Sequence, residues 1–181
     1  HAHLGEYVGS RQLAEEAVKI ELDILGKPIG IQDQHEVAVG GLRMFEFSPV
    51  GNVKGSKLLP DESIKQDFNN SLMLLYTGIT RNSDEILSGL DVVANKNILD
   101  YNKLLVEKGV VSLLKGDLND FGELLDAYWE EKKKLGDKIT NPEIEDMYAK
   151  AKGAGAIGGK IIGAGGGGFL LVMFPANKRA K

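Results

Sequence analysis

Two carboxylates near the start of the chain have positions that could support chemistry. Asp33 stands in the stretch "GIQDQH", between the amides of Gln32 and Gln34. A carboxylate held by neighbouring amides can act as a general base, accepting the proton of a hydroxyl group as its oxygen attacks phosphorus. An aspartate in a turn also commonly caps the backbone, so both interpretations stay open on these residues alone.

Glu21 is the second carboxylate. It follows Ala17 by four residues and precedes Leu25 by four, so it lies along the apolar stripe of a helix predicted for residues 11–25. A carboxylate in that position must be paired, protonated or bound to a metal. Mg²⁺ often takes one or two protein carboxylates together with phosphate oxygens, so Glu21 and a nucleotide could hold it. A buried ion pair is the alternative.

The stretch "YTGITR" gathers hydroxyl groups and a guanidinium at the end of a predicted strand. Tyr76, Thr77, Thr80 and Arg81 could bind sugar hydroxyls or a phosphate, the arginine through two parallel hydrogen bonds. Helix capping and a surface arginine are the alternative. His35 is interpreted as a packing residue of its loop, because no other histidine, cysteine or acid forms a metal-ligand pattern with it.

The stretch "GGKIIGAGGGGFLLVMF", residues 158–174, is dominated by glycine. It matches a dinucleotide-binding pattern only formally, because a strand follows the glycines where a helix should begin. It also lacks the Ser or Thr that follows the lysine of a Walker A loop. A turn packed closely on a neighbour and a wall approached by phosphate or substrate both remain. The residues considered for ligand approach are Gly163, Ala164, Gly165, Gly166, Gly167 and Gly168.

The elements that must position these residues mix helices and strands without strict alternation, which predicts an α+β fold. Besides the helix at 11–25, helical pieces are predicted between residues 84 and 155, with breaks near 100–102, 115–117 and 136–142. Ser83 is expected to cap the first piece. The charged run "WEEKKKLGDK" is interpreted as a solvated helix end. Residues 26–41 are predicted as a loop, and strands are expected at 42–47, 53–59, 71–78 (a buried strand), 158–162 and 169–174.

The composition excludes several classes of protein. The 181 residues suit one compact domain, or one domain with part of a second, and a net charge of −4 gives no reason to expect nucleic acid or an anionic membrane as partner. The absence of cysteine excludes disulfides and thiolate metal sites, which fits a cytoplasmic location. The longest apolar run, residues 169–174, is too short to span a bilayer.

Three stretches taken together resemble the GHMP small-molecule kinase family: "EEAVKIELDILGKPIGIQDQHEVAVGG", "LLYTGITRNSDEIL" and "GGKIIGAGGGGFLLVMF". The similarity covers essentially the whole chain, and within the family it is strongest to the D-glycero-D-manno-heptose 7-phosphate kinase group. The glycine and "GIQDQ" motifs are shared more widely, so galactokinase- or fucokinase-like specificity is the alternative.

The resemblance implies ATP-dependent phosphorylation of a sugar hydroxyl, here the anomeric hydroxyl of a heptose 7-phosphate, with Mg²⁺. It implies that Asp33 deprotonates or polarises that hydroxyl, that Glu21 helps to hold Mg²⁺, and that the glycine motif lies near the nucleotide phosphates. Gln32, Gln34 and the "YTGITR" side chains are expected on the sugar side. The partners expected are a sugar phosphate and ATP, with a homodimer as the expected assembly.

The chain departs from the family pattern in three places. His35 stands where an aromatic residue is usual, and Arg43 where an uncharged polar residue is usual. The phosphate loop of the form P-x-x-x-G-L-G-S-S is absent from the 181 residues and is expected upstream of "HAHLGEY". The chain therefore resembles the end of the N-terminal domain, residues 1–60, and a C-terminal α/β-sandwich (ferredoxin-like) domain, residues 61–181. A catalytically silent module that binds a sugar phosphate is the alternative function.

Overall fold

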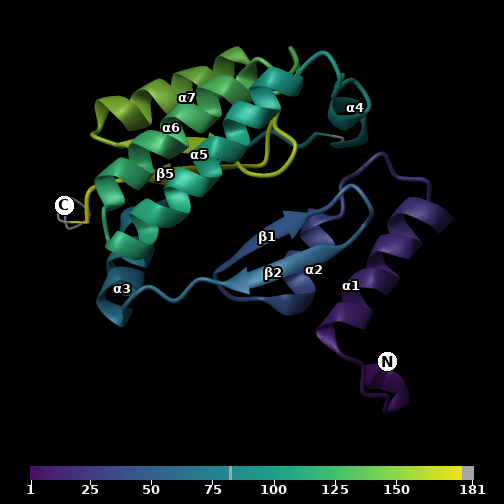
Figure 1. Cartoon of the computed structure of the whole chain (residues 1–181). Helices are drawn as coiled ribbons and strands as arrows, with labels where there is room; N and C mark the ends of the chain where they lie inside the picture. The colour runs from purple at the N-terminus through teal and green to yellow at the C-terminus, as the bar shows by residue number, and fades with distance from the viewer. Residues whose placement is uncertain (82, 177–181) are drawn as a thin grey trace. The chain divides into compact units, whose positions relative to one another are not determined.

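The chain divides into two compact units, His1–Leu59 and Pro60–Lys181 (Figure 1). The computed structural model describes residues 1–81 and 83–176. Both units combine helices with antiparallel strands, and the predicted α+β class is confirmed. None of the helices in the described part of the chain is both long and apolar enough to cross a lipid bilayer.

The first unit contains helices followed by a hairpin. The two strands pair antiparallel, with Arg43 opposite Lys57 and Phe47 opposite Val53. Its elements are η1 (Ala2–Leu4), α1 (Ser10–Val18), η2 (Lys19–Ile24), α2 (Gln32–Val39), β1 (Arg43–Phe47) and β2 (Val53–Lys57).

The helix predicted for residues 11–25 is not regular. Its α-helical part, α1, ends at Val18 and the chain continues as the π-helix η2. Such wider turns are rare and are enriched at functional sites. A spacing argument based on 3.6 residues per turn cannot anticipate them, because the change in winding depends on tertiary contacts. Leu25, which the sequence places on the apolar stripe of this helix, is exposed, as are Leu13 and Ile24.

The loop predicted for residues 26–41 is partly wrong, because Gln32–Val39 forms the helix α2. Asp33 therefore lies in the first turn of a helix. The glycines and the proline at residues 26–30 do form a loop, but Gly40 and Gly41, both at positive φ, end the helix. Glycine commonly terminates helices in this way, and here the terminator was mistaken for a continuation of the loop.

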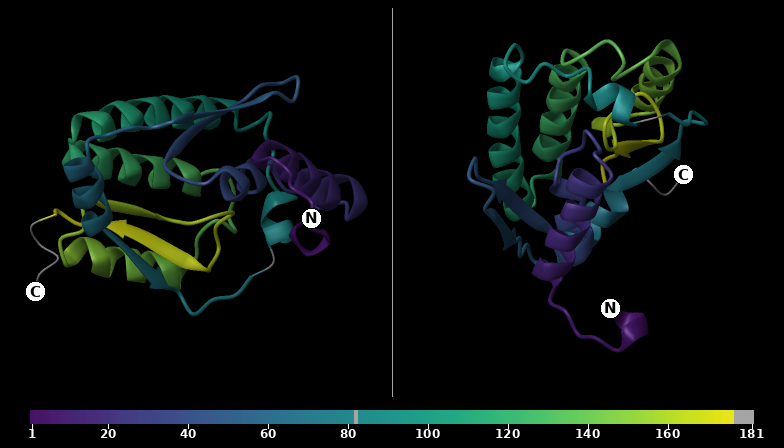
Figure 2. Two further views of the ribbon diagram at one scale, coloured as in Figure 1. Left: turned by 90° about the horizontal axis from the view of Figure 1, so that it is seen from below. Right: turned by 90° about the vertical axis from the view of Figure 1, so that its right-hand side faces the viewer.

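The second unit places helices on a three-stranded antiparallel sheet with the order β3-β5-β4 (Figure 2). Leu75 and Ile161 both lie opposite Leu170 of the central strand. The elements are α3 (Glu62–Ser71), β3 (Leu72–Tyr76), α4 (Ser83–Leu87), α5 (Lys96–Lys115), α6 (Leu118–Lys133), α7 (Pro142–Gly153), β4 (Gly158–Ile161) and β5 (Phe169–Met173).

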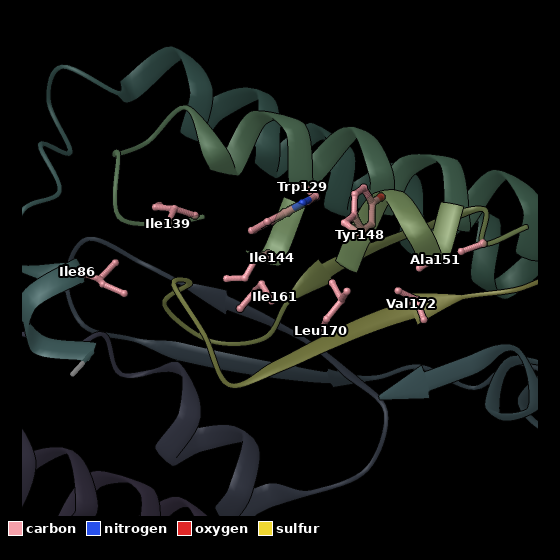
Figure 3. Close-up of a cluster of buried hydrophobic side chains, with 10 residues drawn as sticks. Ile86, Trp129, Ile139, Ile144, Tyr148, Ala151, Ile161, Leu170 and Val172 are labelled. Carbon is pink, nitrogen blue, oxygen red and sulfur yellow. The ribbon is translucent and has the colours of Figure 1, made fainter. Parts of the chain in front are cut away.

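The core of this unit lies between the sheet and helices α6 and α7 (Figure 3). Trp129 of α6 and Ile144 of α7 are fully buried, together with Leu170 and Val172 of the central strand. Burial of an aromatic or aliphatic side chain stabilises a fold by about 1.5–3 kcal/mol. This core fixes the ends of β4 and β5, and therefore the glycine loop between them.

Two element predictions for the second unit are wrong, and one helix was missed. The helix α5 runs without a break through residues 100–102, and the helix α3 was not anticipated. The strand expected to be buried exposes one face, with Leu74 and Tyr76 each more than half exposed. A run of apolar residues looks the same in a strand covered on one face as in a strand covered on both.

Candidate active site

Two of the predicted site residues, Glu21 and Asp33, lie on helices of the first unit that a hydrogen bond joins. The Nε2 atom of Gln34 donates a hydrogen bond to Oε2 of Glu21, 3.1 Å away, and so joins α2 to η2. Asp33, next to Gln34 in sequence, is exposed in the first turn of α2 and has no hydrogen bond or ion pair to any described residue. The pair of helices therefore presents one anchored and one accessible carboxylate.

The side chains of Glu21 and Gln34 bring together oxygen atoms that suit a hard cation. Glu21 is half-buried, and the Oε1 atom of Gln34 is buried without a hydrogen-bond partner among the described residues. A buried amide oxygen without a partner costs free energy unless a donor or cation satisfies it. Carboxylate and amide oxygens coordinate Mg²⁺, so the side chains of Glu21 and Gln34 suit this ion. The described residues contain no cluster of three or more His, Cys, Asp or Glu side chains that could hold a metal.

The neighbouring residues of α2 have different environments. Gln32 is exposed, and its Nε2 atom donates to Glu36 at 2.6 Å. His35 is buried, with Nδ1 donating to the carbonyl of Ile31 at 2.8 Å and its ring edge against Phe47. His35 thus has the packing role expected of it, and Gln32 remains accessible to a ligand.

In the second unit, the stretch Tyr76 to Arg81 is bonded to the glycine loop. The backbone nitrogen and the hydroxyl of Thr77 both donate to the carbonyl of Gly168, each at 2.9 Å. Tyr76 packs beside Phe169 and is half-exposed, while Thr80 is exposed. Of the four residues predicted to bind substrate here, Thr77 is occupied within the fold, and the other three are at least partly accessible.

The glycine loop connects two neighbouring antiparallel strands and packs closely on other segments. A β-carbon at Gly165 would lie 2.7 Å from the carbonyl oxygen of Ile139, and one at Gly167 would lie 2.7 Å from that of Ile79. Gly165 also has φ +112°, which side chains rarely allow. The sequence left two interpretations of the glycines open: a closely packed turn, or a surface that a ligand approaches. These close backbone contacts explain why a packed turn requires glycine here.

Backbone donors of the loop are already used within the unit. The nitrogen of Gly166 donates to Ile139 at 2.7 Å, and that of Gly168 donates to Ile79 at 2.9 Å. Asn141, which caps α7 by accepting from Ile144, also donates to the carbonyl of Gly166 at 3.3 Å. These two glycine nitrogens therefore cannot form part of an N–H cradle for phosphate in this conformation.

Sequence reasoning missed Lys132 and Lys160. Lys132 had been placed on a solvated helix end, but it is half-buried, and its Nζ donates to the carbonyl of Gly163. Burial, and then the charges of Lys160 and Arg81, lower the pKa of Lys132 to about 8. The four-residue spacing of Tyr128 and Lys132 puts both residues on one side of α6. This spacing is the sequence feature that could have shown that Lys132 packs against the unit.

The depressed pKa of Lys132 makes stability depend on pH in a defined direction. The unfolded lysine keeps its proton up to its ordinary pKa of 10.5, whereas the folded one loses it near 8. The unfolded state binds more protons between these values, so this group makes the free energy of unfolding rise as pH increases from about 8. The free energy of unfolding is measured by urea denaturation at several pH values between 7 and 9.5, and for Lys132→Met it should not show this increase with pH. The exposed Lys134→Met should keep it, and identical pH profiles for all three proteins would refute the assignment.

Comparison with known proteins agrees with the motifs. Residues 110–181 match the sequence family described as "GHMP kinases C terminal". The D-glycero-alpha-D-manno-heptose 7-phosphate kinase of Campylobacter jejuni is 28% identical, over 97% of this chain and 52% of its own length. A mevalonate kinase of Pyrococcus horikoshii is 30% identical, over 97% of this chain and 51% of its own length. The chain thus spans about half the length of these curated relatives.

A solved structure shows the same arrangement of elements. The crystal structure of a D-glycero-D-manno-heptose 1-phosphate kinase from Bacteroides thetaiotaomicron superimposes with a TM-score of 0.67 and 26% identity, covering 97% of this chain and 48% of that one. The recognition made from the three motifs is confirmed by the match of residues 110–181 to the GHMP kinase C-terminal family.

Proposed function

We propose that this chain contributes to an ATP-dependent sugar kinase, and that its acceptor is the anomeric hydroxyl of a heptose 7-phosphate. The observation that carries the proposal is the hydrogen bond between Glu21 and Gln34, because it joins the helix that carries Glu21 to the helix that carries Asp33. The named relatives, which include heptose-phosphate kinases, support the reaction class.

Asp33 is the general base of the proposed reaction. The acceptor oxygen forms a bond to the γ-phosphorus of ATP, the bond from that phosphorus to the oxygen retained by ADP breaks, and the hydroxyl proton passes to the carboxylate of Asp33. The exposure of Asp33, without a described hydrogen bond, leaves its oxygens accessible to a hydroxyl group. Gln32 and Gln34 flank Asp33 in the sequence. In this proposal Gln32 orients the sugar, and Gln34 orients the carboxylate of Glu21.

Glu21 and Gln34 are the residues that would hold Mg²⁺ in this proposal. The ion, when bound, neutralises charge on the phosphate oxygens. The protein's part is to present the carboxylate of Glu21 and the amide oxygen of Gln34 together, through the hydrogen bond that joins η2 to α2. We also propose a cytoplasmic location and a homodimer; both remain predictions.

Acceptor selectivity tests the proposed function. The protein is incubated with Mg²⁺ and ATP and with heptose 7-phosphate, galactose, fucose or mevalonate in turn, and ADP and the phosphorylated product are measured. The highest kcat/KM is expected with heptose 7-phosphate. A higher value with galactose or fucose would overturn the acceptor assignment. Binding of the heptose phosphate without magnesium-dependent ATP affinity would instead favour a silent binding module.

Glu21→Gln should raise the Mg²⁺ concentration needed for half-maximal activity by about tenfold, because a neutral amide is a weaker ligand for a hard cation than a carboxylate. Activity is measured across a magnesium titration at saturating ATP. The matched control is Glu15→Gln on α1, an exposed residue paired with Arg11. Loss of stability with an unchanged magnesium dependence would show that Glu21 only anchors the helices.

A further inference from the structure

The strand β3 forms one edge of the sheet in the second unit, and β5 is its only strand partner in the described part of the chain (Figure 2). Thr77 donates its backbone N–H to Gly168, the next pair in the register of β3 and β5. Hydrogen-bonded pairs alternate along antiparallel strands, so the odd-numbered residues of β3 direct their backbone groups at β5. The even-numbered residues direct theirs away from the sheet: Leu72, Leu74 and Tyr76.

These outward backbone groups, apart from one N–H, have no hydrogen-bond partner. The N–H of Leu72 is bonded to the carbonyl of Asn69 at the end of α3. No described residue bonds to the carbonyl of Leu72, or to the N–H and C=O of Leu74 and Tyr76. The edge of β3 therefore offers two donors and three acceptors in the extended geometry that a further strand requires.

The side chains of β3 do nothing to prevent such pairing. Natural proteins protect the edges of their sheets with lysine, proline, bulges or inward-pointing charges. The sequence of β3, "LMLLY", contains none of these residues. Leu74 and Tyr76 are more than half exposed, and Phe169, opposite Tyr76 on β5, is half-exposed. A further strand along this edge would cover apolar surface as well as bond to the backbone.

A second copy of this chain is complementary to the edge. With a two-fold axis at Leu74, two antiparallel β3 strands overlap over all five of their residues. Leu74 then donates to the carbonyl of Leu74 in the other copy, and Tyr76 donates to the carbonyl of Leu72. Each copy supplies two donors, so the pair forms four hydrogen bonds. The strand is uncharged, so the axis brings no like charges together.

We propose that two copies of this chain associate through the β3 edge, so that their two three-stranded sheets become one six-stranded sheet. This interface rests on the homodimer proposed above and names the surface that forms it. Each copy uses the same edge, so the pairing closes at two copies.

Sedimentation of the parent chain up to about 100 µM should show a dimer whose population rises with concentration. Leu74→Lys places two ammonium groups opposite each other and should raise the dissociation constant of the dimer at least about tenfold. Val106→Lys, at a similarly exposed apolar residue of α5, is the matched control and should leave the dimer unchanged. A dimer that Leu74→Lys leaves intact would overturn the interface and retain the homodimer. A parent chain that stays monomeric would overturn both.

Opposite charges at Leu74 test the position of the two-fold axis. Leu74→Glu alone should weaken the dimer as Leu74→Lys does. An equimolar mixture of the two variants should associate again, because a carboxylate then faces an ammonium group across the axis. A mixture that associates no better than either variant alone would overturn the register centred on Leu74.

Amide hydrogen exchange tests the interface in the parent chain, without any substitution. The amides of Leu74 and Tyr76 should exchange more slowly as the concentration rises into the range of the dimer. The amides of Met73 and Leu75 are directed at β5 in monomer and dimer alike, so they are the internal control. Exchange at Leu74 and Tyr76 that does not depend on concentration would overturn the second copy as the partner of this edge. None of these measurements requires phosphoryl transfer, so the interface and the kinase proposal fail separately.

Discussion

Asp33→Asn is expected to lower the rate of ATP-dependent sugar phosphorylation by at least about 100-fold, the scale of a lost general base. The amide keeps the size of the side chain but cannot accept the hydroxyl proton. Asp33 is exposed at the start of α2 and has no hydrogen bond within the described chain, so the substitution should leave the fold intact. The decrease should appear in kcat, with little change in the KM for ATP.

Glu36→Gln is the matched control for Asp33→Asn. Glu36 is an exposed acid of the same helix, one turn further on, and accepts a hydrogen bond from Gln32. The two substitutions remove the same charge from α2, so they should change the electrostatic field at its surface similarly. If Asp33→Asn retains turnover within a few-fold of the parent, or if Glu36→Gln is equally damaging, Asp33 is not the base.

Gly165→Ala should lower the free energy of unfolding by about 3 kcal/mol, the second large effect that we expect. The added carbon would lie 2.7 Å from the carbonyl oxygen of Ile139 and 3.0 Å from its Cα, both of which are backbone atoms that side-chain rotation cannot move. The φ of +112° at Gly165 adds backbone strain. Urea denaturation measures the change.

Gly168→Ala separates the steric part of this effect from the backbone part. Gly168 also has a positive φ, +83°, but a β-carbon there would meet no atom within 4 Å. It should therefore cost only about 1 kcal/mol, the backbone term alone. Equal losses for the two variants would show that the close approach of Ile139 to the loop contributes nothing to stability.

The glycine loop shows how far sequence reasoning reached in the second unit. Apolar runs on both sides of "GAGGGG" predicted two strands joined by a turn, and β4 and β5 have that arrangement. The α+β class and the resemblance of the C-terminal part to GHMP kinases were also predicted correctly. Strand-forming runs, glycines and short motifs are local properties of the chain, and local properties can be read directly from its residues.

The candidate site depended more on contacts distant in the chain. Asp33 and Glu21 were identified as a pair of candidate carboxylates, but "GIQDQ" was assigned to a loop, and its last three residues, Gln32–Gln34, form the start of α2. The hydrogen bond from Gln34 to Glu21 joins residues 13 positions apart, across a π-helical turn. Neither the spacing of apolar residues nor the helix propensities contain that information.

The sequence by itself therefore determined the fold class, the strands beside the glycine loop and the chemical types available for a phosphoryl-transfer site. Only the tertiary structure decided that Lys132 leaves the solvated face of α6 to bind the carbonyl of Gly163 near Arg81. The physical reason is that burial and charge proximity depend on which segments pack together. A lysine in a charged run has the same local sequence whether it faces water or two other cations.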